Sequence, residues 1–164
     1  MTELNLQRAF ELQRQLQIES YGVDPATLEG EDKIQFIKDM VLAATDELHE
    51  ALGETDWKPW AEGESVNREL YIGELVDVFH FFMNLCIVVD LTPEDLLDRY
   101  VTKRTINARR QLEGYDGRST KCPECGKALD DPAVQCHEIL NIDSRSGTTV
   151  VAYWCQTRLR RIPA

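Results

Sequence analysis

Hydrophobic positions in the first 115 residues follow a helical period, with almost no strand alternation. The clearest segment is 31–53, where apolar residues recur at alternating steps of three and four and therefore share one helix face. The same reasoning predicts helices at 4–21, 66–89 and 92–114, the last with a threonine cap, an N-terminal proline and a C-terminal glycine. The sequence therefore predicts an all-α fold, an antiparallel helical bundle of four or more helices.

The helix predicted at 66–89 is apolar nearly all round but keeps a polar stripe. In ELVDVFHFFMNL, which begins at Glu74, helical spacing puts Asp77 and Asn84 on the same side as Glu74, with His80 beside them. A helix that is apolar on most faces is expected to be buried. Ionised carboxylates in such a place are strongly destabilised unless a cation or a metal compensates them. The stripe therefore predicts a partner for its acids.

The helix at 31–53 supplies more acid rather than a compensating lysine. Glu47 and Glu50 lie three residues apart on one face, so two acid pairs converging between helices would repel each other. Mg²⁺ prefers oxygen ligands and keeps waters for substrate phosphates, so we predict two or more Mg²⁺ ions held by Glu47, Glu50, Glu74 and Asp77. A di-iron site would need Glu-x-x-His motifs, which neither pair has. The alternative is that the acids lie on solvated faces, which is the better interpretation for Glu47 and Glu50 taken alone.

The helix at 92–114 carries the opposite charge. Lys103, Asn107 and Arg110 follow steps of four and three and form a cationic edge. Arginine grips phosphate with two parallel hydrogen bonds and lysine acts as a point charge, so this edge suits a di- or triphosphate near Mg²⁺. The alternative is an ordinary solvated basic helix end, which the helix dipole favours.

Cysteine spacing sets the chain after about residue 118 apart. Cys122-x-x-Cys125 followed by glycine is a zinc-knuckle turn, and Cys136, His137 and Cys155 lie beyond it. Two strand-like segments flank the turn SRSG, which predicts a small zinc-binding β ribbon with a structural Zn²⁺. The fourth ligand is open between Cys136 and His137, with Cys136 preferred. We expect a helical domain at 1–117 and a zinc-ribbon-like appendage at 118–164, with Cys86 as an inert core thiol.

Composition narrows the range of partners. The net charge of −11, without a basic run, argues against stable nucleic-acid binding. No segment reaches about 18 uninterrupted apolar residues, and the N-terminus lacks the pattern of a signal peptide. We therefore expect a soluble cytoplasmic protein with no membrane partner.

The motifs together resemble the all-α NTP pyrophosphatase superfamily, which includes MazG-like enzymes and dimeric dUTPases. The two acid pairs separated by a Trp-containing loop carry the resemblance to the superfamily. WKPW, ELVDVFHFFMNL and K-x-x-x-N-x-x-R-Q-x-x-G-Y, in this order, resemble the dUTPase branch. The resemblance implies Mg²⁺-dependent hydrolysis of a deoxynucleoside triphosphate to the monophosphate and pyrophosphate, dUTP first, with dCTP, dATP or dGTP as alternatives. It also implies a homodimer. Compact members are common in phages, in which case the host cytoplasm is the expected location.

The resemblance also implies roles for individual residues. Glu47 or Glu50 would position or deprotonate the attacking water, and Lys103, Asn107 and Arg110 would hold the phosphates. Base recognition would involve Gln13, Gln17, Trp57, Trp60, Asn84 and Tyr115. Both tryptophans have an alternative role in closing the bundle. A hypothesis of another class is a non-catalytic dimeric helical adaptor that uses the zinc ribbon to hold a protein partner.

Overall fold

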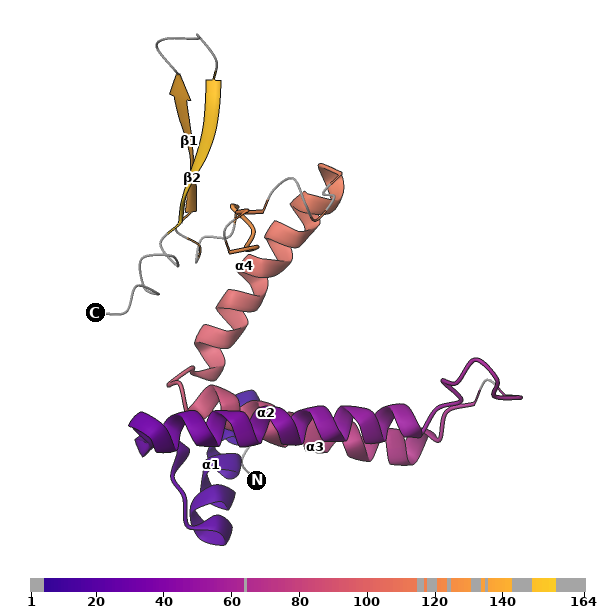
Figure 1. Ribbon diagram of the computed structural model, residues 1–164. Helices are drawn as coiled ribbons and strands as arrows, with labels where there is room; N and C mark the ends of the chain where they lie inside the picture. The colour runs from indigo at the N-terminus through magenta and orange to yellow at the C-terminus, as the bar shows by residue number, and fades with distance from the viewer. Residues whose placement is uncertain are drawn as a thin grey trace. The chain divides into compact units, whose positions relative to one another are not determined.

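The chain divides into two compact units, Met1–Asp98 and Arg99–Ala164, and each is described by itself (Figure 1). The computed structural model describes residues 5–63, 65–114, 117, 121–123, 125–130, 134, 136–142 and 149–155. Four α-helices account for most of this length, which confirms the predicted all-α class for the helical part.

Three helices build the first unit. They are α1 (Leu6–Tyr21), α2 (Gly30–Gly53) and α3 (Arg68–Ile87), with a short 3₁₀ turn at Pro25–Thr27 between the first two. Their bounds follow the predicted segments to within two residues. The side chain of Asn5 caps α1 by accepting a hydrogen bond from the Arg8 amide. α2 and α3 lie side by side along their lengths, and α1 packs on α3 (Figure 1).

A closed loop joins α2 to α3. Thr55 and Val66 form an isolated antiparallel bridge at its base. The Asp56 carboxylate accepts hydrogen bonds from the Ser65 amide at 2.8 Å and the Ser65 hydroxyl at 2.7 Å. A Cβ atom on Gly63 would lie 2.5 Å from Asp56 Oδ2, so a larger residue there would have to displace the Asp56 carboxylate from its hydrogen bonds with Ser65. These contacts fix the two ends of the loop on adjacent helices.

The hydrophobic core of the first unit lies between α1 and the C-terminal half of α3. Phe10, Met83 and Cys86 are buried there. Partly buried neighbours packed on them are Leu6, Ala9, Ile87, Leu91 and Leu96. Burial raises the pKa of the Cys86 thiol, as expected for a thiol inside a core.

The expectation that α3 is buried on most faces was wrong for the single chain. Large apolar residues on both long helices are exposed, among them Ile34, Val41, Leu48, Leu75, Val76, Phe79 and Phe82. The physical reason is that only one face of α3 meets α2, and α1 covers only its C-terminal half. By length and composition α3 also has the properties of a membrane span, a weak indication that core helices of soluble proteins share.

α4 (Pro93–Leu112) and a two-stranded sheet complete the described elements. Thr92 caps α4 as predicted, because its hydroxyl accepts a hydrogen bond from the Asp95 amide at 3.1 Å. Gly114 follows the helix with a φ of 72°, the left-handed conformation that glycine adopts at low cost. Strands β1 (Cys136–Ile142) and β2 (Thr149–Cys155) pair antiparallel, from Cys136 opposite Cys155 to Ile142 opposite Thr149. The predicted ribbon of strands is therefore present.

Candidate active site

Carboxylates from α2 and α3 meet between these two neighbouring helices. Glu47 and Glu50 lie three residues apart on α2, and Glu74 lies on α3. One carboxylate oxygen from each of the three lies within 4.8 Å of the others. Glu47 and Glu74 are half-buried, whereas Glu50 is exposed. The structure thus brings three of the four predicted acids together, and this group is called the acidic cluster below.

The electrostatics of Glu47 show how strongly these acids act on one another. Desolvation raises the pKa of Glu47, and a hydrogen bond with Glu74 raises it further. The negative charges of Glu50, Asp77 and Glu74 act in the same direction. Asp77, the fourth predicted acid, is exposed, and its charge influences Glu47 although it is not one of the three grouped residues. All four predicted acids therefore interact electrostatically at one place.

The donor chemistry of the acidic cluster suits a hard divalent cation. Its ligand atoms are carboxylate oxygens, which Mg²⁺ prefers over nitrogen or sulfur donors. The repulsion that raises the pKa of Glu47 is the interaction that a bound cation reverses. Because Glu50 is exposed, the cluster is also open to solvent, as a site that must admit a substrate phosphate has to be.

A buried network of polar side chains connects α1, α2 and α3. Gln13 donates from Nε2 to Asn84 Oδ1 at 3.0 Å, and its Oε1 contacts Nδ1 of His80. Asn84 in turn donates from Nδ2 to the Met40 sulfur at 3.3 Å. Gln13, Gln17 and Asn84 are the buried polar residues of the described chain. Three residues predicted to read a base are therefore buried, and two of them, Gln13 and Asn84, are hydrogen-bonded to each other.

The two tryptophans lie on the loop between α2 and α3 and are exposed. Trp57 is 53% exposed and Trp60 is 76% exposed. The ammonium of Lys58 lies 6.0 Å from the centre of the Trp57 ring. Neither ring belongs to the buried core of the first unit, so in the single chain the loop does not use them to close the helices.

The predicted phosphate ligands lie on α4, in the second unit. Lys103 and Asn107 are exposed, and Arg110 is half-buried. The Arg110 guanidinium donates two hydrogen bonds to the Asp130 carboxylate. The structure thus places the three residues along one helix, in a different unit from the acidic cluster. Tyr115 lies outside the described residues.

The four predicted cysteines of the tail come together. The sulfurs of Cys122, Cys125, Cys136 and Cys155 all lie within 4.8 Å of one another. Three of the four residues are buried and Cys125 is half-buried. Neighbouring thiols and desolvation raise the pKa of Cys136 to about 12, with desolvation the larger cause. His137 is the next residue along β1.

Two residues that form hydrogen bonds at these sites, Asp130 and Met40, could not be identified from any pattern in the sequence. Asp130 binds both Arg109 and Arg110, and Met40 accepts a hydrogen bond from Asn84. Asp130 lies in a short turn without helical or strand periodicity, and Met40 reads as an ordinary apolar position on α2. Only the folded chain brings these residues to their partners.

The fold and the acidic cluster together define a class of protein: an all-α protein in which two neighbouring helices bring together carboxylates that suit divalent cations. The sequence model of a family described as dUTPase matches residues 5–92, more than half of the 164 residues, and the chain belongs to this family. A dCTP pyrophosphatase of Enterobacteria phage LZ5 is 28% identical over an alignment of 141 residues, and the match covers 67% of this chain and 82% of the relative. No solved structure matches the chain.

These matches confirm the resemblance to the all-α NTP pyrophosphatase superfamily. The chain is a nucleoside triphosphate pyrophosphohydrolase, so the adaptor hypothesis is set aside. The family match includes the acidic cluster and the buried network of Gln13 and Asn84. It ends at residue 92, before the cationic residues of α4 and before the four cysteines of the tail.

Proposed function

We propose that this protein hydrolyses dUTP to dUMP and pyrophosphate with Mg²⁺ held by Glu47, Glu50, Glu74 and Asp77. The observation that carries the proposal is the acidic cluster, three carboxylate oxygens from two helices within 4.8 Å of one another. Bound Mg²⁺ would supply charge neutralisation of the substrate phosphates and a lower pKa of a bound water. Two or more ions fit the number of carboxylates better than one, since four acidic side chains share the site.

The protein's own residues would then divide the remaining work. The water oxygen forms a bond to the α phosphorus, the bond from that phosphorus to the oxygen bridging the α and β phosphates breaks, and the bridging oxygen leaves with pyrophosphate. A carboxylate oxygen of Glu47 or Glu50 accepts the proton that the water loses, and geometry in the substrate complex decides between them. Lys103, Asn107 and Arg110 of α4 steady the phosphates and offset the charge that develops on the leaving group.

Base recognition rests on amide side chains in this proposal. Gln13, Gln17 and Asn84 are buried, and an amide offers both a donor and an acceptor. Uracil and cytosine differ at their pairing edge by exchanging donors and acceptors, and a rotated amide can match either one. Trp57 and Trp60 are exposed aromatic rings suited to stacking on a base face, and Tyr115 completes the proposed set.

The second candidate substrate is dCTP. The observation that favours dCTP is the curated relative, which is a dCTP pyrophosphatase. The description of the matching family favours dUTP. The chemistry at the acidic cluster is the same for both substrates, so the choice depends on the base site alone.

We further propose a homodimer as the working form, with the cytoplasm as its location. Ile34, Val41 and Leu48 are spaced by seven along α2 and are exposed, as are Leu75 and Phe79 on α3. Apolar stripes of this extent on neighbouring helices are typical of surfaces that a second chain covers.

The test is a turnover assay with dUTP, dCTP, dTTP, dATP and dGTP, in Mg²⁺ and in EDTA, with monophosphate and pyrophosphate quantified separately. We expect turnover that requires Mg²⁺ and is fastest with dUTP. If turnover is fastest with dCTP, the proposed Mg²⁺-dependent hydrolysis stands but the preferred base is cytosine instead of uracil. Glu74→Gln should lower Mg²⁺-dependent turnover by about 100-fold or more, because it removes a metal ligand.

The matched control for this variant is Glu69→Gln. Glu69 lies on the same helix, pairs with Arg68 and is exposed, so its replacement removes the same charge outside the acidic cluster. It should leave turnover within about twofold of the unmodified chain. Equal turnover in Glu74→Gln and Glu69→Gln would refute the proposed metal site.

A further inference from the structure

The tail carries a second site that the nucleotide chemistry does not use. In the described part of the second unit, the buried cluster consists of Cys122, Cys136 and Cys155, with Cys125, Leu129 and Val134 packed against it. A cluster of this size is too small to hold a β ribbon together by apolar contact alone. None of the five cysteines, all of which are described, forms a disulfide. The question is what holds the four sulfurs together.

The spacing of the sulfurs matches ligands around one ion. The sulfurs of Cys136 and Cys155 lie 3.5 Å apart, and those of Cys125 and Cys136 lie 3.7 Å apart. A tetrahedral Zn²⁺ with bonds of about 2.3 Å to sulfur places its ligands about 3.8 Å apart. Two sulfurs of a disulfide would instead be about 2.05 Å apart. These two separations, with all four sulfurs within 4.8 Å of one another, therefore fit the ligands of one tetrahedral ion.

The backbone presents these cysteines in two pairs. The Cys122 amide donates to the Lys127 carbonyl at 2.8 Å, and the Gly126 amide donates to the Cys122 carbonyl at 2.8 Å. Gly126 has a φ of 69°, which only glycine adopts at low cost, and Lys121 bridges Ala128 to close the turn. The second pair is Cys136 and Cys155, which face each other in the β1–β2 register. The first pair comes from a closed turn and the second from paired strands, so two separate segments each supply two sulfurs to a four-thiolate site.

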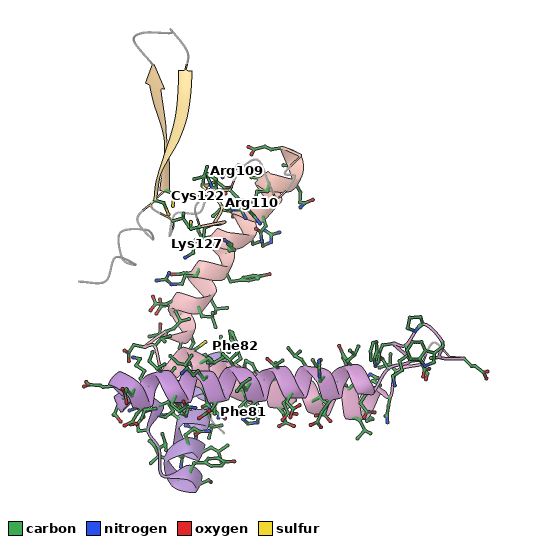
Figure 2. All side chains as sticks on the ribbon, viewed as in Figure 1. Phe81, Phe82, Arg109, Arg110, Cys122 and Lys127 are labelled. Atoms are coloured by element: carbon green, nitrogen blue, oxygen red, sulfur yellow. The ribbon has the colours of Figure 1, made fainter. Side chains whose placement is uncertain are left out.

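A charged contact joins this cluster to the end of α4. Asp130 follows Leu129, which packs on the cysteines. Its carboxylate accepts hydrogen bonds from Arg110 Nε at 2.9 Å and from Arg109 Nη2 at 3.1 Å. The Arg110 side chain is 12% exposed and that of Asp130 is 28% exposed, so this is a partly buried ion pair. Figure 2 labels both arginines near the C-terminal end of α4, with Cys122 and Lys127 on the segment that follows.

We infer that Cys122, Cys125, Cys136 and Cys155 bind one structural Zn²⁺ as four thiolates, and that this ion holds Asp130 in place against Arg109 and Arg110. Zinc has no redox role in this site and no open coordination position, because four protein ligands complete its tetrahedron. Cys136 rather than His137 is the fourth ligand, since its sulfur already belongs to the group. Each thiol releases its proton to solvent when the metal binds.

The ion pair has a consequence for Arg110. Its guanidinium uses two hydrogen bonds on Asp130, the same donors with which arginine grips a phosphate. While Zn²⁺ holds the turn, Asp130 therefore competes with any phosphate for this arginine. Loss of the ion loosens the turn and with it the ion pair that Asp130 makes with both arginines.

The test measures metal content and protease access on the full chain. Elemental analysis should find one Zn²⁺ per chain, and replacement by Co²⁺ should give the intense absorption of a tetrahedral cobalt thiolate. Cys125→Ser and Cys155→Ser should each lose stoichiometric Zn²⁺, whereas Cys86→Ala, which changes the thiol of the first unit, should keep it. Where a cysteine variant is insoluble, the cobalt spectrum of the unmodified chain decides. Absence of that spectrum overturns the site.

Limited digestion with trypsin tests the coupling to α4. Removal of Zn²⁺ should raise the rate of cleavage after Arg109 and Arg110 by about tenfold, because both arginines lose their ion pair with Asp130 and the following turn loosens. Asp130→Asn should raise the same cleavage while keeping one Zn²⁺ per chain. Unchanged cleavage in both cases overturns the coupling but not the metal site. Neither measurement uses nucleotide turnover, so their failure and the failure of the proposed hydrolysis are separate results.

Discussion

Glutamine in place of Glu47 should stabilise the metal-free chain and remove its response to Mg²⁺. The Glu47 carboxylate lies within 4.8 Å of those of Glu50 and Glu74. Two unit charges at such a distance repel each other by about 0.9 kcal/mol in a medium as polar as water, and by more where water is partly excluded. Removal of both repulsions should raise the free energy of unfolding by about 1 to 2 kcal/mol.

The sign of the pH dependence follows from the raised pKa of Glu47. Folded Glu47 keeps its proton to a higher pH than unfolded Glu47 does, so the folded chain loses stability as pH rises through the interval between the two pKa values. Below the usual pKa of glutamate, Glu47 is protonated in both states and its effect vanishes. The advantage of Glu47→Gln should therefore be absent in acid and complete above the raised pKa.

The assay is thermal unfolding followed by circular dichroism, with EDTA or with Mg²⁺, for the unmodified chain, Glu47→Gln and Asp46→Asn. In EDTA near neutral pH, Tm of Glu47→Gln should rise by about 2 to 8 °C. Asp46 is exposed on the same helix and lies outside the acidic cluster, so Asp46→Asn should change stability by less than about 0.5 kcal/mol. Mg²⁺ should raise Tm of the unmodified chain and of Asp46→Asn but not of Glu47→Gln. A lower Tm for Glu47→Gln in EDTA, or an equal response to Mg²⁺, would refute the reasoning.

Two further predictions concern the interior of the first unit. Phe10→Ala should lower the free energy of unfolding by about 3 to 5 kcal/mol in urea denaturation, because it leaves a cavity against Met83 and Cys86. Asn84→Ala should lower the same free energy by about 1 to 3 kcal/mol, since Gln13 keeps a buried amide without its acceptor. A loss below about 0.5 kcal/mol in either case would contradict the described packing.

Local features of this chain could be read from its sequence with little error. Helical periodicity predicted α2 as residues 31–53, and the helix runs from Gly30 to Gly53. The Thr92 cap and Gly114 were predictable because capping depends on residues within one turn of the helix end. The same holds for the acid pairs, whose spacing of three places both members on one face whatever the rest of the chain does.

Pairings between distant segments were not predictable in the same way. Hydrogen bonds to Asp130 and to Met40 depend on how side chains far apart in the sequence meet, and no period records this. The exposure of Phe79 and Phe82 was missed for a related reason. The pattern of apolar residues indicates which face of a helix is hydrophobic. It does not indicate whether that face is covered by the same chain or by another molecule.

Two unfavourable features of the isolated chain therefore occur on the same pair of helices. α2 and α3 bring like charges together at Glu47, Glu50 and Glu74, and they leave Val41, Phe79 and their apolar neighbours in contact with water. Each feature costs stability in the metal-free single chain. A divalent cation relieves the first, and an apolar partner surface relieves the second. The stability of this helix pair should thus depend on whether it binds a cation and a partner surface. The stabilisation by each is therefore best measured from the metal-free, monomeric state, which lacks both.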